Sequence, residues 1–187
     1  MYKIITPVAT EPITLTEVRQ HLRLPDELAE DDLLLFLITT ARNYCEDYTR
    51  RAFAEQTLEL LLDRFPLSGP ITLPCPPLQN VSSITCTNST GEEIIIPTSD
   101  YIVDADREPG QVVLQSGAAW PVFTPFPTSP IRIRFVAGYD MLPATLKQAM
   151  LLLIGHWYEN REATGSAKDE TAFSVHALLS PYRLEAF

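Results

Sequence analysis

The 187-residue sequence carries 24 acidic and 14 basic side chains, and its formal net charge of −10 argues against direct binding to nucleic-acid phosphates. The length suits one compact domain with a sizeable core, and the longest apolar stretch, residues 149–154, is too short to span a bilayer. Because the N-terminus lacks the apolar run of a signal peptide, we expect a soluble protein that is not exported. The three cysteines have no metal-binding spacing and are expected to be reduced, buried thiols.

The first part of the chain predicts two helices. Thr14 and Glu17 form a capping box, Ile13 and Val18 occupy the positions of a hydrophobic staple, and Pro25 ends this short first helix. A second helix of about 20 residues begins within residues 29–32 and runs to the arginines at 50 and 51. Its apolar stripe recurs every 3.6 residues, at Leu34, Leu37, Ile38, Ala41, Cys45 and Tyr48.

The middle of the chain predicts short strands separated by proline- and glycine-rich turns. We expect strands near Gln56–Phe65, Ile71–Leu73, Val81–Thr87, Glu92–Ile96, Tyr101–Val103, Gln111–Leu114 and Ile131–Val136. Asn88–Gly91 is a candidate hairpin turn. In the last strand apolar residues alternate with Arg132 and Arg134, which predicts one buried face and one charged face. Residues 115–130 read as a long, proline-stiffened loop.

The end of the chain predicts a helix followed by an interaction tail. The helix begins after Leu142-Pro143 and continues to about Arg161. The polar residues 162–171 read as a flexible linker, and the apolar tail 172–187 is either folded back on its own chain or kept for a neighbour. We favour the interface. Its candidate residues are Phe173, Val175, Leu178, Leu179, Pro181, Tyr182 and Arg183.

These elements predict an α+β fold. N-terminal and C-terminal helices form a bundle, an antiparallel β-rich insertion lies between them, and an extended C-terminal arm follows. We expect an N-terminal helical part at 1–55, the insertion at 56–140, a long helix packing on the N-terminal helices at 141–161, and the linker and arm at 162–187.

No motif predicts catalysis, a cofactor or a metal site. His156 and Glu159 have the spacing of metal ligands but no second pair supports them, and a half-buried histidine at a helix contact is the favoured interpretation. The acids from Asp104 to Glu108 lack the glycine and the distal glutamate of a calcium loop, so a solvated turn is expected.

Three aromatic residues lie on the long loop, namely Trp120, Phe123 and Phe126. Two interpretations remain open for them. They either close the end of the β-rich core or present a rigid interface, because aromatic side chains among prolines lose little entropy on binding.

Several segments resemble one family in the same order along the chain. Residues 11–18 with 21–24 resemble the "EPVTLxEAKxHLR" opening of tailed-phage head–tail connector proteins, and residues 178–183 resemble the "LLxPYR" end of that family. Further similar segments lie between them, at 31–32, 41–42, 48–52, 56–57, 73–74, 77–78, 81–84, 101–104, 120–121, 135–139, 142–143 and 146–147.

The resemblance implies a structural virion protein without enzymatic activity, located at the head–tail interface and in the host cytoplasm during assembly. Such an adaptor forms a ring of about a dozen subunits under the portal protein, completes the DNA-filled head and receives a downstream connector or tail-completion protein. DNA would pass through the lumen without sequence-specific binding, which the acidic charge favours. No cofactor and no membrane are implied. The alternative function is a small non-enzymatic binding module that uses the loop around Trp120.

Overall fold

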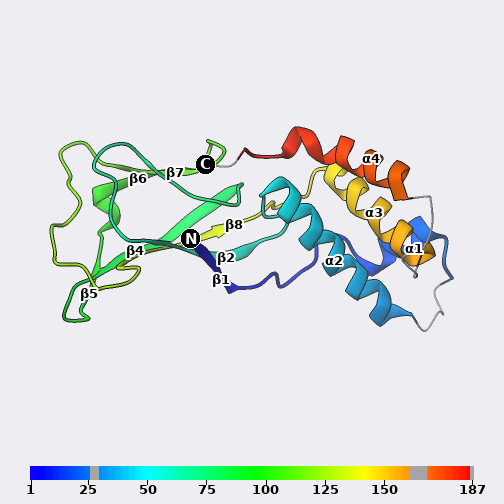
Figure 1. The fold of residues 1–187 in the computed structure, drawn as a ribbon, viewed down its shortest axis with the longest axis horizontal. Helices are drawn as coiled ribbons and strands as arrows, with labels where there is room; N and C mark the ends of the chain where they lie inside the picture. Colours follow the sequence, from blue (N-terminus) through cyan, green and yellow to red (C-terminus); the bar gives the residue numbers. More distant parts are fainter. Residues whose placement is uncertain (26–29, 161–167, 186–187) are drawn as a thin grey trace. The chain divides into compact units, whose positions relative to one another are not determined.

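The computed structural model describes residues 1–25, 30–160 and 168–185, with the side chains of 168–172 excepted. They form two compact units, shown in Figure 1. Residues 1–9 and 55–139 make a β unit, and residues 10–54 and 140–187 make a helical unit. The chain therefore passes between the units three times. No helix among the described residues is long and apolar enough to cross a membrane.

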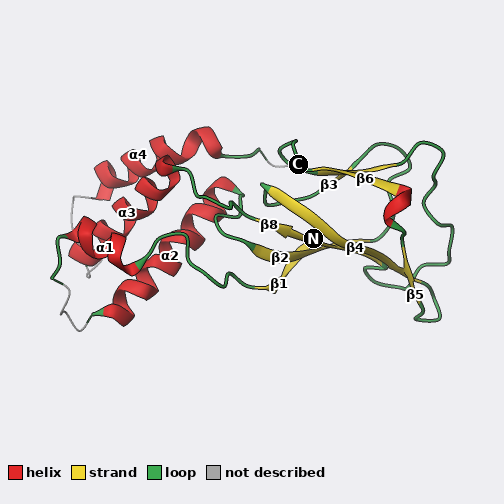
Figure 2. Ribbon diagram, turned by 180° about the vertical axis from the view of Figure 1, so that it is seen from behind, coloured by secondary structure: helices red, strands yellow, loops and turns green. Residues whose placement is uncertain are grey.

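The β unit holds two antiparallel sheets (Figure 2). The larger sheet has the strand order β1-β2-β8-β4-β5 and consists of β1 (Tyr2–Thr6), β2 (Gln56–Leu62), β8 (Ile131–Ala137), β4 (Leu78–Thr87) and β5 (Glu93–Ile95). The smaller sheet has the order β3-β7-β6 and consists of β3 (Ile71–Thr72), β7 (Gln111–Leu114) and β6 (Tyr101–Asp104), the last preceded by the short 3₁₀ helix η1 (Thr98–Asp100).

The alternation predicted for the last strand is confirmed in β8. Ile133 and Phe135 are fully buried, and they lie opposite Leu60 and Leu58 of β2. Arg132 and Arg134 point to the other, exposed face. The strand is central in the sheet, so its apolar face forms much of the core of this unit.

The predicted hairpin at Asn88–Gly91 joins β4 to β5. The Asn88 side-chain oxygen accepts hydrogen bonds from the amides of Thr90 and Glu92, both at 3.0 Å. Gly91 adopts φ of +86°, a conformation that residues with a Cβ rarely take. The turn is therefore fixed by its own local sequence.

The helical unit contains α1 (Leu15–Leu22), α2 (Asp31–Thr49), α3 (Ala144–Glu159), α4 (Lys168–Leu179) and the 3₁₀ helix η2 (Ser180–Tyr182). The capping box at the start of α1 is confirmed. The Glu17 amide donates to Thr14 Oγ1 at 3.2 Å, and the Thr14 amide donates to Glu17 Oε2 at 2.8 Å. Helix α3 packs against α1, α2 and α4, as expected for a bundle of N-terminal and C-terminal helices.

The mixed α+β class is confirmed, but the extended C-terminal arm is wrong in this structure. Residues 168–179 form helix α4, because two of its apolar side chains find partners within the helical unit. Of the expected linker, residues 162–167 lie outside the described residues. A second difference is β1, which the sequence did not predict: its five exposed residues show no buried alternation, and it forms by pairing with β2.

Candidate assembly surfaces

Helix α4 has a buried side that the sequence analysis assigned to a partner. Val175 and Leu179 are completely inaccessible to solvent, and α4 packs against α3 and α2. Apolar side chains that are buried within their own chain stabilise the fold, by about 1.5–3 kcal/mol each when fully covered. These two residues therefore belong to the core of the helical unit.

The segment after α4 is fastened to the end of α2. The Leu184 amide donates to the Thr49 carbonyl at 3.1 Å, and Arg51 Nε donates to the Tyr182 carbonyl at 2.6 Å. The Arg183 guanidinium lies 5.2 Å from the centre of the Tyr48 ring. Thr49 is the last residue of α2, so its carbonyl lacks a partner within the helix. The "LLxPYR" end thus acts as a clasp on α2, and we use the word clasp for Tyr182–Leu184.

Aromatic side chains fill the space between α2 and the C-terminal helices. The His176 ring stacks on Tyr48 with centroids 4.8 Å apart, and His176 Nε2 lies 3.1 Å from the Tyr44 hydroxyl. Tyr44 also meets Trp157 of α3 edge to face. His176 therefore has a packing role within the helical unit.

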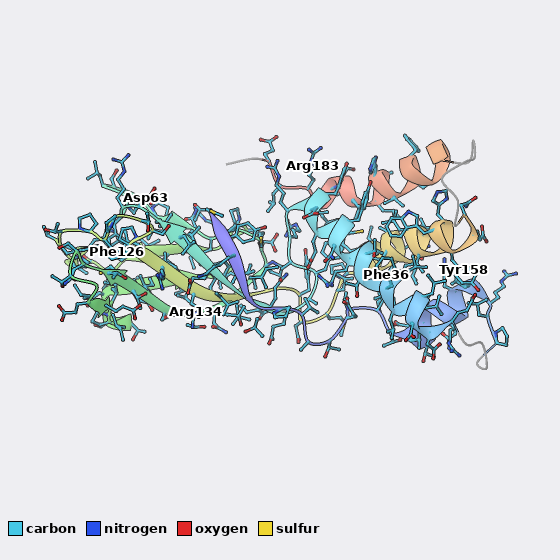
Figure 3. The ribbon with its side chains drawn as sticks, turned by 60° about the horizontal axis from the view of Figure 1, so that its bottom comes forward. Phe36, Asp63, Phe126, Arg134, Tyr158 and Arg183 are labelled. Carbon is cyan, nitrogen blue, oxygen red and sulfur yellow. The ribbon has the colours of Figure 1, made fainter. Side chains whose placement is uncertain are left out.

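Three of the predicted tail residues remain accessible. Phe173 is 76% exposed, and Pro181 and Arg183 are exposed as well, the last labelled in Figure 3. Leu178 and Tyr182 are half-buried. We call the three exposed residues the tail surface. Exposed aromatic and arginine side chains are the types of group that anchor protein interfaces.

The aromatic loop is tied to the β unit at both of its aromatic ends. Trp120 stacks on Phe65 with centroids 4.3 Å apart, and both rings are half-buried. The Phe126 amide donates to the Thr87 carbonyl at 3.0 Å, while the Phe126 side chain is exposed (Figure 3). Phe123 is half-buried and Val122 is fully exposed. The loop therefore has one covered and one accessible part, which is compatible with either interpretation.

An open hollow of about 480 Å³ lies beside Phe65, on which Trp120 of the loop stacks. It is lined by residues 62, 64–68 and 70–72, including Phe65 and the fully exposed Leu67. Arg64 is the charged residue of the lining. Such a hollow can receive an apolar side chain of a partner, but it brings together no set of catalytic groups.

Two exposed apolar residues of α2 were not predicted from the sequence. Leu35 is 47% exposed, and Phe36, which is labelled in Figure 3, is 66% exposed. The available signal was the run of six apolar residues at 33–38. One face of a helix cannot bury six consecutive residues, so some of them had to point outward.

Two charge networks join segments that lie far apart in the sequence. The buried Arg42 donates to Glu11 Oε2 at 2.8 Å and to Glu46 Oε2 at 2.9 Å, and Glu46 Oε1 accepts from the Phe53 amide at 2.7 Å. Burial raises the pKa of Glu46, against the lowering effect of the Phe53 amide and Arg42. In the β unit the buried Glu59 carboxylate lies between Lys3 and Arg134 of β8, each 2.8 Å away.

The weak metal candidates gain no support from their surroundings. His156 is half-buried, and its backbone carbonyl accepts a hydrogen bond from the Asn160 side-chain amide. No group of three potential metal ligands occurs in the part of the chain that the structure describes. Asp104 accepts the Arg107 amide in a turn between β6 and β7. Burial raises the pKa of the Cys45 thiol to about 12, so it is not a nucleophile at neutral pH.

Residues 12–105, about half of the chain, match the sequence profile of the phage gp6-like head-tail connector protein. The chain belongs to this family. Connectors of this family are structural proteins and not enzymes. The match includes α1, α2 and strands β2 to β6; it begins after β1 and ends before β7, β8 and α3.

Solved structures extend the likeness of this gp6-like connector to its full length. It resembles a chain of the neck of an empty gene transfer agent (GTA) particle computed with C6 symmetry, at 26% identity and a TM-score of 0.82. It also resembles chains of the virion of a native GTA particle (27%, TM-score 0.82) and of a native GTA neck computed with C12 symmetry (27%, 0.78). Each likeness covers 100% of this chain and 97% of the other. No curated protein matches the sequence.

Proposed function

We propose that this gp6-like connector is the ring-forming adaptor of a phage-like particle. About a dozen copies dock under the portal protein, complete the DNA-filled head and receive a downstream connector or tail-completion protein. The observation that carries this proposal is the full-length likeness to neck chains of GTA particles, which includes a neck with C12 symmetry. The expected location is the neck of the virion, with the host cytoplasm as the place of assembly.

The tail surface is our proposed contact with the portal or with an adjacent subunit. Its residues are exposed, whereas Val175 and Leu179 are committed to the core. Each contact is small, but a ring repeats it in every subunit, and engagement of one subunit raises the effective concentration of the next. A set of weak contacts can then hold the ring in place.

The acidic charge supports passage of DNA without specific binding. With a formal net charge of −10, the chain repels the phosphate backbone unless a local basic surface compensates. A lumen formed by such chains lets DNA slide during packaging and ejection. Phosphate-dependent binding of free double-stranded DNA at physiological salt would contradict this part of the proposal.

The decisive experiment is electron microscopy of particles made with and without this gene product. We expect DNA-filled heads without the protein to lack tails and to lose DNA, and heads with it to show a ring of density below the portal. Normal tailed particles in its absence would overturn the proposal.

The tail surface is tested by Phe173→Asp in the same particles, with Phe173→Leu as the matched control. Aspartate should reduce incorporation into necks at least tenfold, whereas leucine keeps an apolar contact and should assemble. Equal incorporation of the two variants would remove Phe173 from the interface.

One observation favours a second function, a non-enzymatic binding module. The hollow beside Phe65 and the accessible part of the Trp120 loop lie in the same unit. Substituting Trp120, Phe123 and Phe126 together should then abolish binding of a peptide or carbohydrate without changing the oligomer. Loss of ring formation in this variant would instead assign the loop to assembly.

A further inference from the structure

The larger sheet has two edge strands, β1 and β5, and both expose apolar side chains. Ile4 of β1 is 57% exposed, and Ile95 of β5 is 69% exposed. Edge strands of monomeric proteins are normally blunted, because their outward N–H and C=O groups offer a template for another chain. Two edges with exposed isoleucines on one sheet are therefore candidates for contact with another chain.

The hydrogen bonds to β4 show which backbone groups of β5 point outward. Ile96 donates to the Ile84 carbonyl at 2.9 Å, and Asn88 donates to the Glu92 carbonyl at 3.0 Å, so the even-numbered residues face β4. Because bonding alternates along an antiparallel ladder, the backbone groups of Glu93 and Ile95 point away from the sheet. The Ile95 side chain is exposed on the same strand, so this edge combines polar backbone and apolar surface.

The outward groups of β1 follow from the same alternation. Leu61 of β2 donates to the Met1 carbonyl at 2.8 Å, and Lys3 lies opposite Glu59 two residues further along. Met1 and Lys3 thus face β2, and the backbone groups of Ile4 point outward. A register shift between Ile4 and Thr6 ends the regular part of this edge.

The two edges also carry opposite charges. Lys3 is half-exposed on β1, and Glu93 is exposed on β5. Lys3 shares its sheet face with Glu59 and Arg134, while Glu93 shares that face with Ile95 and Arg132. When β5 of one copy lies beside β1 of another, Glu93 meets Lys3 on that face, whereas contact between two β5 edges would bring glutamates together.

The direction of pairing follows from the topology. Each of the four steps from β1 to β5 is antiparallel, so β1 and β5 run in the same direction. A twelvefold ring turns each subunit by only about 30°, which keeps the strands of neighbours nearly parallel. A joint between β5 of one copy and β1 of the next would therefore be a parallel pair, in which each copy uses two different edges, as a closed ring requires.

We propose that the β5 edge of each subunit adds to the β1 edge of its neighbour, so that the five-stranded sheets continue around the ring. This inference rests on the proposed ring-forming function and names the occupant of both edges as a second copy of this chain. One such joint is short, because β5 has three residues. Closure of the ring then stabilises a contact that is weak in an isolated dimer.

Cysteine cross-linking tests the pairing in assembled necks. In a parallel pair with Glu93 beside Lys3, Ile95 lies beside Ile5, which is 36% exposed. The double variant Ile5→Cys with Ile95→Cys, treated with a short bismaleimide, should give a ladder of covalent oligomers on a denaturing gel. The two single variants and the parent protein, with its three native cysteines, are the controls and should give no ladder. Dimers from Ile5→Cys alone would show two β1 edges in contact and overturn the proposal.

A proline at the β5 edge provides the second test. Ile95→Pro removes an outward N–H that no strand of its own sheet uses, and Ile95→Thr keeps it while also reducing the apolar surface. We expect Ile95→Pro to lower the fraction of protein in rings at least tenfold relative to Ile95→Thr, with the two variants unfolding at similar temperatures. Equal ring formation by both would refute the edge pairing.

The outcomes separate this inference from the proposed function. Parent protein present as a ring in necks, with no ladder from the double variant, would refute only the edge pairing. Parent protein absent from necks would refute the proposed function itself.

Discussion

Leu179→Ala distinguishes a folded C-terminal helix from a free arm. Leu179 is fully buried at the end of α4. Leucine and alanine have similar helix propensities, so the change reports on lost packing. Truncating a buried leucine costs about 2–5 kcal/mol, and we expect about 3 kcal/mol at this helix end. Phe173→Ala on the same helix is the control and should stay within about 0.5 kcal/mol of the parent.

The assay must follow the helical unit by itself, because two units can unfold separately. The chain has two tryptophans, and Trp120→Phe leaves Trp157 of α3 as the only one. Urea unfolding of this background, followed by Trp157 fluorescence, measures the free energy of unfolding of the unit that contains α4. A loss smaller than about 0.5 kcal/mol on Leu179→Ala would refute the packing of α4 and restore the free arm.

Three further changes test other parts of the fold. Hydrogen bonds from the Lys147 ammonium and from the Thr14 amide hold the pKa of Glu17 at about 2. The stabilisation by Glu17 is therefore complete above about pH 4.5 and is lost as the pH falls toward 2. Since Glu17 is about one-third exposed, Glu17→Gln should cost no more than about 1 kcal/mol at pH 7 and flatten the stability profile between those pH values, as measured by urea titration. Glu59→Gln leaves Lys3 and Arg134, each 2.8 Å from the carboxylate, without this charge partner. Burial acts to raise the pKa of Glu59, but the bonds to these two cations outweigh it and lower the pKa in the fold. The variant should therefore lower the melting temperature of the β unit more at pH 7 than at pH 3. Gly110→Ala places a Cβ 2.6 Å from Leu78 Cβ and should destabilise the β unit by about 1–3 kcal/mol in the same titration, whereas a loss below that range would mean that the backbone yields.

Elements with a local cause could be predicted from the sequence. The capping box at Thr14, the turn at Asn88 and the alternation around Ile133 each depend on residues within a few positions of one another. Their physical causes, an orphan amide, a side chain that bonds its own backbone and a sheet with one covered face, are visible in a short window of sequence.

Elements that depend on residues far away in the sequence could not be predicted from it. β1 is a strand because β2, more than 50 residues later, bonds to it, and nothing in its own residues distinguishes it from an exposed segment. The sequence favours an interface for the tail because the polar residues 162–171 before it include no large apolar side chain that would fasten it to its own chain. Whether Val175 meets α3 or another protein is a question of tertiary packing, which composition does not answer. The exposure of Phe36 followed from counting residues on one helix face, and that argument was available.

Because β8 is the central strand, the larger sheet can be completed only late in biosynthesis. β2 and β4 both bond to β8, yet β8 is the last strand that the ribosome produces. Until residue 137 has emerged, the β1-β2 pair and the β4-β5 pair lack the strand that joins them, and the five-stranded sheet that carries both edges does not exist. If neighbours in the ring join through these edges as proposed, a nascent chain offers both edges on one sheet only after translation of the β unit is complete.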